Sequence, residues 1–242
     1  MNNIIGVFDS GIGGLSVLEK LEEVLPYEDF YYYGDSLNNP YGEKSDEELF
    51  NITTSVVDEL RDKGCRLIVI ACNTATTRCI KYLRDKYKDI VFVGTVPAIK
   101  VACDREFKNT LVMATPATIE SERTMELIRD NKREDQNIYL VSCPGLAKAI
   151  EDKDSRQIEE ILKNTFKDYK DKDIDSIVLG CTHYPFIKKE ILKELPGVSL
   201  IDGSSGVANE VKRQLENIGI LSSRRERKVI IYNSLTKEEI IR

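Results

Sequence analysis

Two short apolar runs, each followed by a cysteine, constrain the fold of this chain more than any other feature. Residues 67–70 (LIVI) precede Cys72 by one small residue, and residues 177–179 (IVL) precede Cys181 in the same way. Runs of this length, rich in β-branched residues and bounded by small residues, are typical of strands buried in a parallel sheet. The chain therefore predicts two α/β halves, each with a cysteine where a strand ends.

Strand and helix patterns alternate along the rest of the chain. Short apolar runs bounded by turn residues predict strands, and apolar residues at helical spacing predict helices between them. This alternation is typical of α/β folds with parallel sheets. The predicted strands are residues 4–8, 30–33, 67–70, 91–94, 110–114, 138–141, 177–179, 198–201 and 229–232, and the predicted helices are residues 15–25, 46–63, 74–87, 120–130, 158–169, 187–195 and 207–218.

Two linker-like segments divide the chain into halves. Residues 95–97 (TVP) and residues 202–206 (DGSSG) carry the Pro, Gly and Ser that favour irregular structure. We therefore predict two pseudo-symmetric α/β domains with parallel-rich sheets and an active site in the cleft between them. The first domain is residues 1–96, completed by residues 206–242, and the second domain is residues 97–205.

The composition limits the class of protein. With 242 residues, 41% hydrophobic and 31% charged, the chain predicts a globular protein of one large or two ordinary domains. A net charge of −6 without a basic, aromatic tract argues against a nucleic-acid partner. No apolar run reaches the roughly 18 residues of a membrane span. Six cysteines without a signal-peptide pattern indicate free thiols in a reducing cytoplasm. The charge run at residues 224–228 predicts a solvated loop.

Reactive side chains follow several of the predicted strands. Ligands of open α/β sheets collect outside the carboxyl ends of the strands. Cys181 is followed there by Thr182 and by His183, the chain's only histidine, so a thiol, a hydroxyl and an imidazole come together. Asp9 and Ser10 follow the first strand in the same way. These positions predict a reactive cluster and not merely core packing.

The amino ends of helices supply further polar groups. Asn73 and Thr74 follow Cys72 at the start of a predicted helix. Backbone N–H groups at such a position bind anions and lower the pKa of a nearby thiol. Ser45 and Glu48 have the spacing of a capping box at the start of another helix.

Several of these features also have a plain structural explanation. The glycine-rich residues 11–14 lack the third glycine of a dinucleotide fingerprint and fit an ordinary strand-to-helix turn. Tyr41-Gly42 fits ordinary turn chemistry. The other cysteines are predicted to be small core residues: Cys65, Cys79, Cys103 and Cys143.

Four motifs together resemble the glutamate racemases of the aspartate/glutamate racemase family. They are GVFDSGIGGLSVL at 6–18, YYGDSLNNPYGEKS at 32–45, IACNTATT at 70–77 and LGCTHYP at 179–185. They span most of the chain, and the histidine of the last motif favours glutamate over aspartate racemases. The resemblance implies cofactor-independent interconversion of L- and D-glutamate, which supplies D-glutamate for the peptidoglycan of the bacterial cell wall, and a homodimer.

The resemblance also implies roles for individual residues. Cys72 and Cys181 match the two catalytic thiols. Asp9 would assist Cys72, whereas His183 and Glu151 would assist Cys181. The residues implied to hold the substrate are Asp9, Ser10, Tyr41, Gly42, Asn73, Thr74, Thr115, Thr118, Thr182 and His183.

Two cysteines suit a racemisation for a chemical reason. The α-proton must leave one face of the substrate while a proton arrives at the other, which a thiolate and a thiol on opposite faces accomplish. A free cysteine has a pKa of about 8.5, so the thiolate needs a helix N-terminus or an imidazole beside it. No step requires a cofactor. Zinc held by Cys72, Cys181 and His183 is an alternative, although no C-x-x-C pair supports a metal site.

The sequence is also compatible with two functions other than a glutamate racemase. The loop ATPAT at residues 114–118 stands where GTEGT is commoner in the family, which motivates a racemase of another acidic amino acid, such as aspartate. The second alternative is a non-catalytic amino-acid-binding protein with the same fold.

Overall fold

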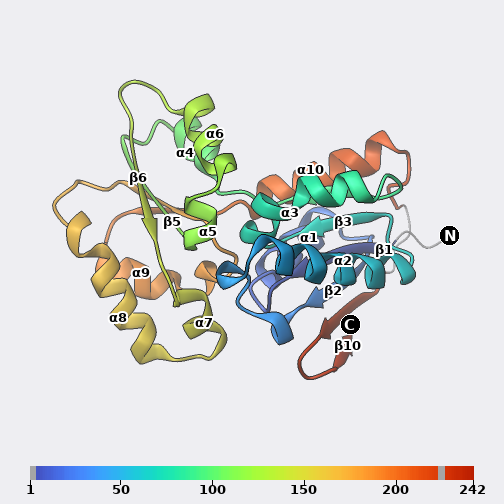
Figure 1. Cartoon of the computed structure of the whole chain (residues 1–242). Coiled ribbons are helices and arrows are strands. Elements are labelled where there is room, and N and C mark those ends of the chain that lie inside the picture. The colour runs from blue at the N-terminus through green and yellow to red at the C-terminus, as the bar shows by residue number, and fades with distance from the viewer. Residues whose placement is uncertain (1–3, 223–226) are drawn as a thin grey trace. The chain divides into compact units, whose positions relative to one another are not determined.

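Two sheets of mostly parallel strands organise the chain, which the computed structural model describes over residues 4–222 and 227–242 (Figure 1). Met1–Thr95 and Ser204–Arg242 together form one compact unit, here called unit 1, and Val96–Gly203 forms unit 2. Residues 224–226 of the predicted charged loop lie outside the described ranges. The predicted α/β class with parallel-rich sheets is confirmed.

Unit 1 contains a sheet in the order β10-β9-β2-β1-β3-β4. Neighbouring strands run parallel except β10, which pairs with β9 in the antiparallel direction. Because parallel strands share a direction, their carboxyl ends meet at one edge of the sheet. The strands are β1 (Ile4–Asp9), β2 (Asp29–Gly34), β3 (Leu67–Ile70), β4 (Val91–Gly94), β9 (Val229–Asn233) and β10 (Glu239–Ile241).

Helices cover both faces of the unit 1 sheet. The helices α1 (Leu15–Val24) and α10 (Ser204–Asn217) pack on one face, where Leu18 and Val211 share a buried core with β-strand residues. The helices α2 (Asp46–Asp62) and α3 (Asn73–Lys86) pack on the other face. Two 3₁₀ turns follow β2, η1 (Ser36–Asn38) and η2 (Tyr41–Glu43).

Unit 2 repeats this arrangement around a smaller sheet in the order β6-β5-β7-β8, with all strands parallel. One face carries helices α4 and α6, and the other carries α7, α8 and α9 (Figure 1). The elements are α4 (Ile99–Asp104), β5 (Asn109–Ala114), α5 (Pro116–Ile119), α6 (Glu122–Asn131), β6 (Asn137–Ser142), α7 (Leu146–Glu151), α8 (Ser155–Phe166), η3 (Lys167–Tyr169), β7 (Ser176–Leu179), η4 (Tyr184–Ile187), α9 (Lys188–Glu194) and β8 (Ser199–Ile201).

Short elements are the ones that the sequence patterns did not predict. The helices α4, α5 and α7 have six, four and six residues, too few to display helical periodicity. The strand β10 has three residues, all exposed. The longer strands and helices lie where they were predicted, with ends shifted by a few residues. The capping box is confirmed, because the Ser45 hydroxyl accepts from the Glu48 N–H and Glu48 accepts from the Ser45 N–H.

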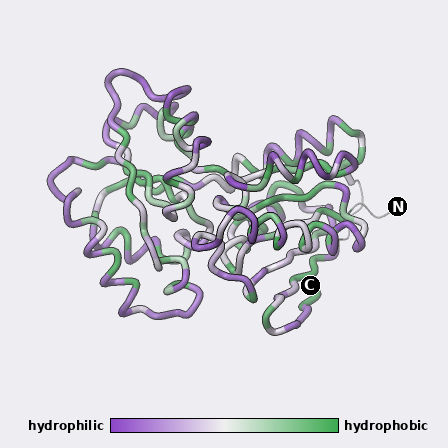
Figure 2. The backbone as a smooth tube through the Cα atoms, in the orientation of Figure 1, coloured by the Kyte–Doolittle hydropathy of each residue, from purple (hydrophilic) through white to green (hydrophobic). Residues whose placement is uncertain are grey.

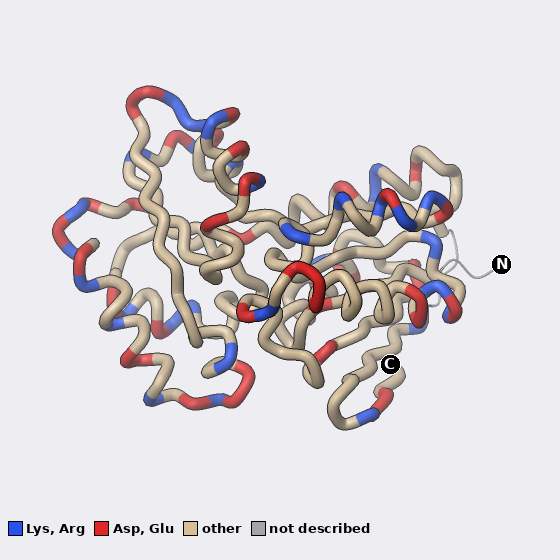
Figure 3. The backbone as a smooth tube through the Cα atoms, in the orientation of Figure 1, with Lys and Arg blue, Asp and Glu red and all other residues tan. Residues whose placement is uncertain are grey.

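The hydropathy of each element follows its position. Figure 2 shows hydrophobic residues along the strands, with hydrophilic and hydrophobic residues alternating along outer helices such as α8. Figure 3 shows acidic and basic residues interspersed on α8 and α10. Some of these charges form exposed ion pairs, such as Arg213 with Glu210, and such pairs contribute little to stability. No helix in the described part of the chain combines the length and the apolar character needed to cross a membrane.

Candidate active site

The carboxyl edge of the unit 1 sheet gathers the polar residues predicted from the first half of the chain. In the sheet register, Asp9 of β1 lies opposite Gly34 of β2, and Phe8 lies opposite Ile70 of β3. Asp9 and Ser10 therefore leave the sheet beside the strand that leads to Cys72. The sheet topology alone brings these side chains together.

Cys72 lies at the N-cap of the 14-residue helix α3. Its thiol donates toward the Ser10 hydroxyl, with 4.0 Å between sulfur and oxygen. Asn73 and Thr74 are the first residues of the helix, as predicted, and both are buried. The N-terminal end of a helix favours an anion, so this position supports a negatively charged sulfur.

Asp9 is completely buried beside this cysteine strand. Its Oδ1 accepts a hydrogen bond of 3.2 Å from the Gly11 N–H, which fixes the carboxylate in the strand-to-helix turn. The turn needs its small residues, because a Cβ at Gly14 would lie 2.6 Å from the Asp9 Cβ. The glycine-rich stretch is thus a strand-to-helix turn that holds Asp9 close to the helix.

Tyr41 and Gly42 lie in η2, which follows the carboxyl end of β2. The Tyr41 side chain is buried, and its hydroxyl donates to Asp35 Oδ2 at 2.7 Å. Burial raises the pKa of Tyr41 well above its ordinary value, and the negative charges of Asp35, Cys72 and Asp9 act in the same direction. The hydroxyl therefore keeps its proton, and the ring lies close to the other side chains of this edge.

The carboxyl edge of unit 2 carries the second set of predicted residues. The strands β5 and β7 are neighbours, with Met113 opposite Leu179, so Thr115 and Cys181 leave adjacent strands. A Cβ at Gly180 would lie 2.8 Å from the Ala114 Cβ and 3.0 Å from a backbone oxygen. Only glycine allows β7 to approach β5 this closely immediately before the cysteine.

Three residues of unit 2 form a chain of contacts that ends at Cys181. The Cys181 sulfur lies 3.8 Å from His183 Nδ1, and His183 Nε2 lies 2.6 Å from the Glu151 carboxylate. Glu151 is the last residue of α7, and the imidazole is almost fully buried. A carboxylate acceptor keeps a proton on Nε2, which leaves Nδ1 facing the thiol. This arrangement of thiol, imidazole and orienting carboxylate is typical of activated cysteines.

Thr115 and Thr118 lie in the short turn that follows β5. Thr115 is the N-cap of α5, and its hydroxyl accepts from the Thr118 N–H and donates to the Thr118 hydroxyl at 3.0 Å. Thr118 is fully buried, whereas Thr115 is partly exposed at the edge. Thr182 is buried beside Cys181.

The other four cysteines are buried and free, as predicted for core residues. Burial raises the pKa of Cys65 and of Cys143 to about 12 and that of Cys79 to about 11. Burial also raises the pKa of Cys103. At neutral pH these thiols are protonated and take no part in acid–base chemistry.

Some polar groups near the two edges were not singled out from the sequence. Asp35 follows β2 directly, beside Asp9 at the end of β1, so its strand-end position was the available signal. Within residues 4–222 and 227–242, some buried polar atoms have no hydrogen-bond partner: both amide atoms of Asn39, Asn73 Oδ1, Thr95 Oγ1 and the Tyr184 hydroxyl. Thr95 and Asn73 follow β4 and β3 at the same edge of unit 1.

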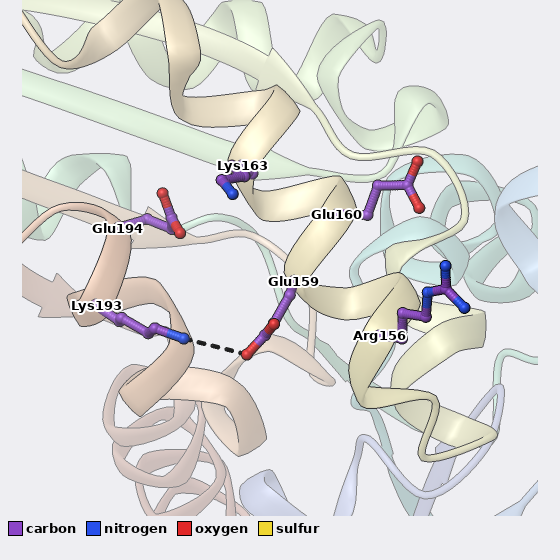
Figure 4. A pocket seen from close by; sticks show the side chains of 6 residues that line it. All are labelled: Arg156, Glu159, Glu160, Lys163, Lys193 and Glu194. Carbon is purple, nitrogen blue, oxygen red and sulfur yellow. Dashed lines mark hydrogen bonds and ion pairs between the residues drawn. The ribbon is translucent and has the colours of Figure 1, made fainter.

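A charged surface hollow of unit 2 lies outside this set of residues. Its volume is about 360 Å³, and Figure 4 shows the six charged side chains of α8 and α9 that line it, with Lys193 paired to Glu159 at 3.2 Å. Acidic and basic side chains occur in equal number around it, so it has no clear preference for an anion or a cation. Among the described residues, no group of three His, Cys, Asp or Glu side chains is arranged to hold a metal ion.

The comparisons with known proteins agree on one family. The sequence profile of the Asp/Glu/hydantoin racemase family matches residues 5–211. A glutamate racemase of Clostridium acetobutylicum is 45% identical over 244 residues, which cover 99% of this chain and 95% of that protein.

Solved structures give the same result. The glutamate racemase of Francisella tularensis, in complex with D-glutamate, matches with a TM-score of 0.83 and 31% identity over 96% of this chain and 88% of that one. The Escherichia coli glutamate racemase, in complex with L-glutamate and the activator UDP-MurNAc-Ala, matches with a TM-score of 0.84 and 30% identity over 96% of this chain and 89% of that one. The predicted enzyme class, an isomerase of the racemase type, is confirmed. The chain belongs to the Asp/Glu/hydantoin racemase family.

Proposed function

We propose that this protein interconverts L- and D-glutamate by a two-base mechanism that uses Cys72 and Cys181. The observation that carries the proposal is the matched position of the two thiols, each at the carboxyl edge of a parallel sheet and each beside its own polar partners. The relatives named glutamate racemase, and the related structures in complex with D- and L-glutamate, support glutamate as the substrate.

The proposed reaction moves one proton off the substrate and another proton onto it. One cysteine, as thiolate, takes the α-proton and becomes a thiol, and the electron pair of the broken C–H bond remains on the α-carbon. The other cysteine, as thiol, then delivers its proton to the opposite face and becomes a thiolate. The reverse reaction starts from the exchanged protonation states of the two cysteines.

On the Cys181 side, the imidazole is the group that accepts or returns the thiol proton. Nδ1 of His183 lies 3.8 Å from the sulfur, and Glu151 at 2.6 Å from Nε2 stabilises the imidazolium that forms. On the Cys72 side, the α3 N-terminus stabilises the thiolate, and Asp9 is the carboxylate that assists it.

The other predicted residues serve to hold the substrate. We propose that hydroxyls and amides of both edges bind the two carboxylates and the amino group and stabilise the charge that develops at the α-carbon. The residues assigned to this role are Asp9, Ser10, Tyr41, Gly42, Asn73, Thr74, Thr115, Thr118, Thr182 and His183.

We extend the proposal to the biological setting. The reaction needs neither a cofactor nor a metal, and its product would supply D-glutamate for peptidoglycan in the cytoplasm. We propose a homodimer as the working form, because the resemblance to the family implies one.

The decisive experiment follows the α-proton. The purified protein is incubated in D₂O with L-glutamate and, separately, with D-glutamate, while mass spectrometry measures deuterium at Cα and circular dichroism measures optical activity. We expect deuterium to enter as optical activity is lost from either enantiomer. We expect Cys72→Ser and Cys181→Ser to abolish the interconversion, whereas Cys103→Ala, which alters a buried cysteine of α4, retains it.

Other outcomes point to other functions. Interconversion that survives in both Cys72→Ser and Cys181→Ser would contradict the two-thiol mechanism. Exchange from aspartate but not from glutamate would favour a racemase of another acidic amino acid, which the ATPAT loop motivates. Tight binding of glutamate without exchange would favour the non-catalytic binding protein.

A further inference from the structure

Asp35 is a buried carboxylate on which several hydrogen bonds converge. It follows β2 at the carboxyl edge of unit 1, and only 1% of its surface is exposed. The Asn38 amide donates to both of its oxygens, at 3.0 and 2.9 Å, and the Tyr41 hydroxyl donates to Oδ2 at 2.7 Å. The Asp35 N–H donates to the backbone oxygen of Asp9 at 2.9 Å, which ties the residue to the neighbouring strand.

A third donor reaches Asp35 from the far end of the chain. The Ser234 hydroxyl, in the turn between β9 and β10, donates to Asp35 Oδ1 at 2.8 Å. The same hydroxyl accepts from the Leu37 N–H at 3.0 Å, and the neighbouring Asn233 amide donates to the Ser36 hydroxyl at 3.1 Å. This hairpin lies beyond residue 211, where the match to the family profile ends.

The Tyr41 hydroxyl is committed to this carboxylate. The side chain is almost fully buried, and its one hydroxyl proton is used in the bond to Asp35. Asn39 lies between these two donors in the sequence. Its side chain adds no hydrogen bond to the loop, because neither of its amide atoms has a partner within the described ranges. Asp35 is thus the point at which the side chains of Asn38 and Tyr41 are fixed to the sheet.

We propose that Asp35 is a positioning residue that holds the Tyr41–Gly42 turn at the carboxyl edge of unit 1, and that Ser234 of the C-terminal hairpin holds Asp35 in turn. The Tyr41 hydroxyl donates to Asp35, so Tyr41 helps to hold the substrate through the position of the turn that it anchors. This inference rests on the proposed function, because the turn matters to catalysis only where it helps to hold the substrate.

The chemistry of the site requires a carboxylate at position 35. A carboxylate has two oxygens that only accept hydrogen bonds, and the groups that surround it are all donors. An asparagine at this position would keep one acceptor oxygen and turn an N–H₂ group toward one of the donors. The loop would then lose at least one charge-assisted hydrogen bond and gain an unfavourable contact between donors.

The test compares Asp35→Asn, Tyr41→Phe and the double variant with a matched control. Asp29→Asn makes the same chemical change at the other end of β2, where a buried carboxylate accepts from the Lys228 N–H at 2.8 Å, away from the carboxyl edge. The measurements are KM and kcat for L- and D-glutamate, the melting temperature, and the rate at which trypsin cleaves after Lys44, the residue that follows η2.

We expect Asp35→Asn and Tyr41→Phe each to raise KM by about tenfold with kcat changed much less, because a misplaced binding turn weakens ground and transition states alike. The KM of the double variant should be no higher than that of the more affected single variant, since both changes break the same contact between Asp35 and Tyr41. Cleavage after Lys44 should accelerate in both single variants. Asp29→Asn should lower the melting temperature and leave KM and the cleavage rate unchanged.

Opposite results separate the failure of this inference from the failure of the proposed function. Suppose that the wild-type protein racemises glutamate. If Asp35→Asn then behaves like Asp29→Asn, or if the effects of Asp35→Asn and Tyr41→Phe on KM add in the double variant, Asp35 does not act through Tyr41. If neither the wild-type protein nor any variant racemises glutamate, the proposed function is wrong. The rate of cleavage after Lys44 then still decides whether Asp35 anchors the turn. If Asp35→Asn does not fold, Tyr41→Phe decides the question with the same measurements.

Discussion

At the scale of single residues, the six cysteines fall into two groups according to how completely they are buried and whether burial raises the pKa of the thiol. Cys72 and Cys181 lie where strands end, are 6% and 7% exposed, and have a hydroxyl or an imidazole near the sulfur. The other four have exposed fractions of 3% or less, and burial raises the pKa of each of their thiols. The same side chain therefore acts as a core residue in one setting and as a candidate base in the other.

Thiol alkylation tests this division. At pH 8 we expect iodoacetamide to label Cys72 and Cys181 first, because burial keeps the other thiols protonated. A pKa of about 12, as at Cys65 and Cys143, leaves only about one thiolate in 10⁴ at that pH. Since a raised pKa means that the thiolate forms only at higher pH, labelling of Cys65 and Cys143 should increase as the pH rises toward that value.

Peptide mass spectrometry after short exposures measures the order of labelling. The control is the denatured protein, in which all six thiols should react at similar rates. Labelling of Cys65 or Cys143 in the native protein as fast as Cys72 would contradict the assignment.

At the scale of elements, the position of each reactive side chain depends on how closely two strands approach. The strands β5 and β7 come together at Gly180, where a Cβ would meet the Ala114 Cβ at 2.8 Å and the Met113 oxygen at 3.0 Å. Because Cys181 is the next residue, any separation of the strands at this point moves the thiol relative to His183. The glycine before the cysteine is thus part of the geometry of the site.

We expect Gly180→Ala to lower the rate of racemisation by about a hundredfold, since a displacement of about 1 Å can have that effect on a positioned reactive group. Gly206→Ala is the matched control, because Gly206 lies in α10 and a Cβ there meets nothing within 4 Å. That change should leave activity intact and raise the free energy of unfolding by up to about 1 kcal/mol, as expected when a helical glycine becomes alanine. Full activity in Gly180→Ala would show that β7 does not need this close approach.

At the scale of the whole molecule, the two units differ in how the chain builds them. Unit 2 is one continuous segment with its own sheet and a hydrophobic cluster on each face. Unit 1 needs both ends of the chain, because α10 covers one face of its sheet and β9 extends the sheet beside β2. The C-terminal segment also supplies Ser234, which donates to Asp35.

This difference predicts the behaviour of fragments. We expect a fragment of residues 96–203 to fold alone and unfold cooperatively, as measured by circular dichroism during heating. A fragment of residues 1–95 should not, because without α10 the apolar face that contacts Val207 and Val211 becomes exposed to water. Adding a peptide of residues 204–242 should restore its structure. Cooperative unfolding of residues 1–95 alone would contradict this account of unit 1.

Local patterns predicted much of this architecture. The strands at residues 67–70 and 177–179 were evident from apolar runs with small residues behind them, and the capping box from Ser45 and Glu48. These features depend on neighbours in sequence. The resemblance to the family implied the site residues. The tertiary structure brings Cys72 beside Ser10 and, in unit 2, Glu151 beside His183, whereas Cys181 and His183 are already neighbours in the sequence.

Local sequence patterns were enough to predict the alternation of strands and helices and the edge of each sheet at which the polar residues gather, and the motifs were enough to identify the family. The local patterns were enough because backbone geometry, side-chain periodicity and turn residues act over short stretches of chain. The role of Asp35 as a shared acceptor for Asn38, Tyr41 and Ser234 became evident only from the folded chain. Nothing in the local pattern links position 35 to position 234, because that contact forms only when β9 pairs with β2 in a definite register.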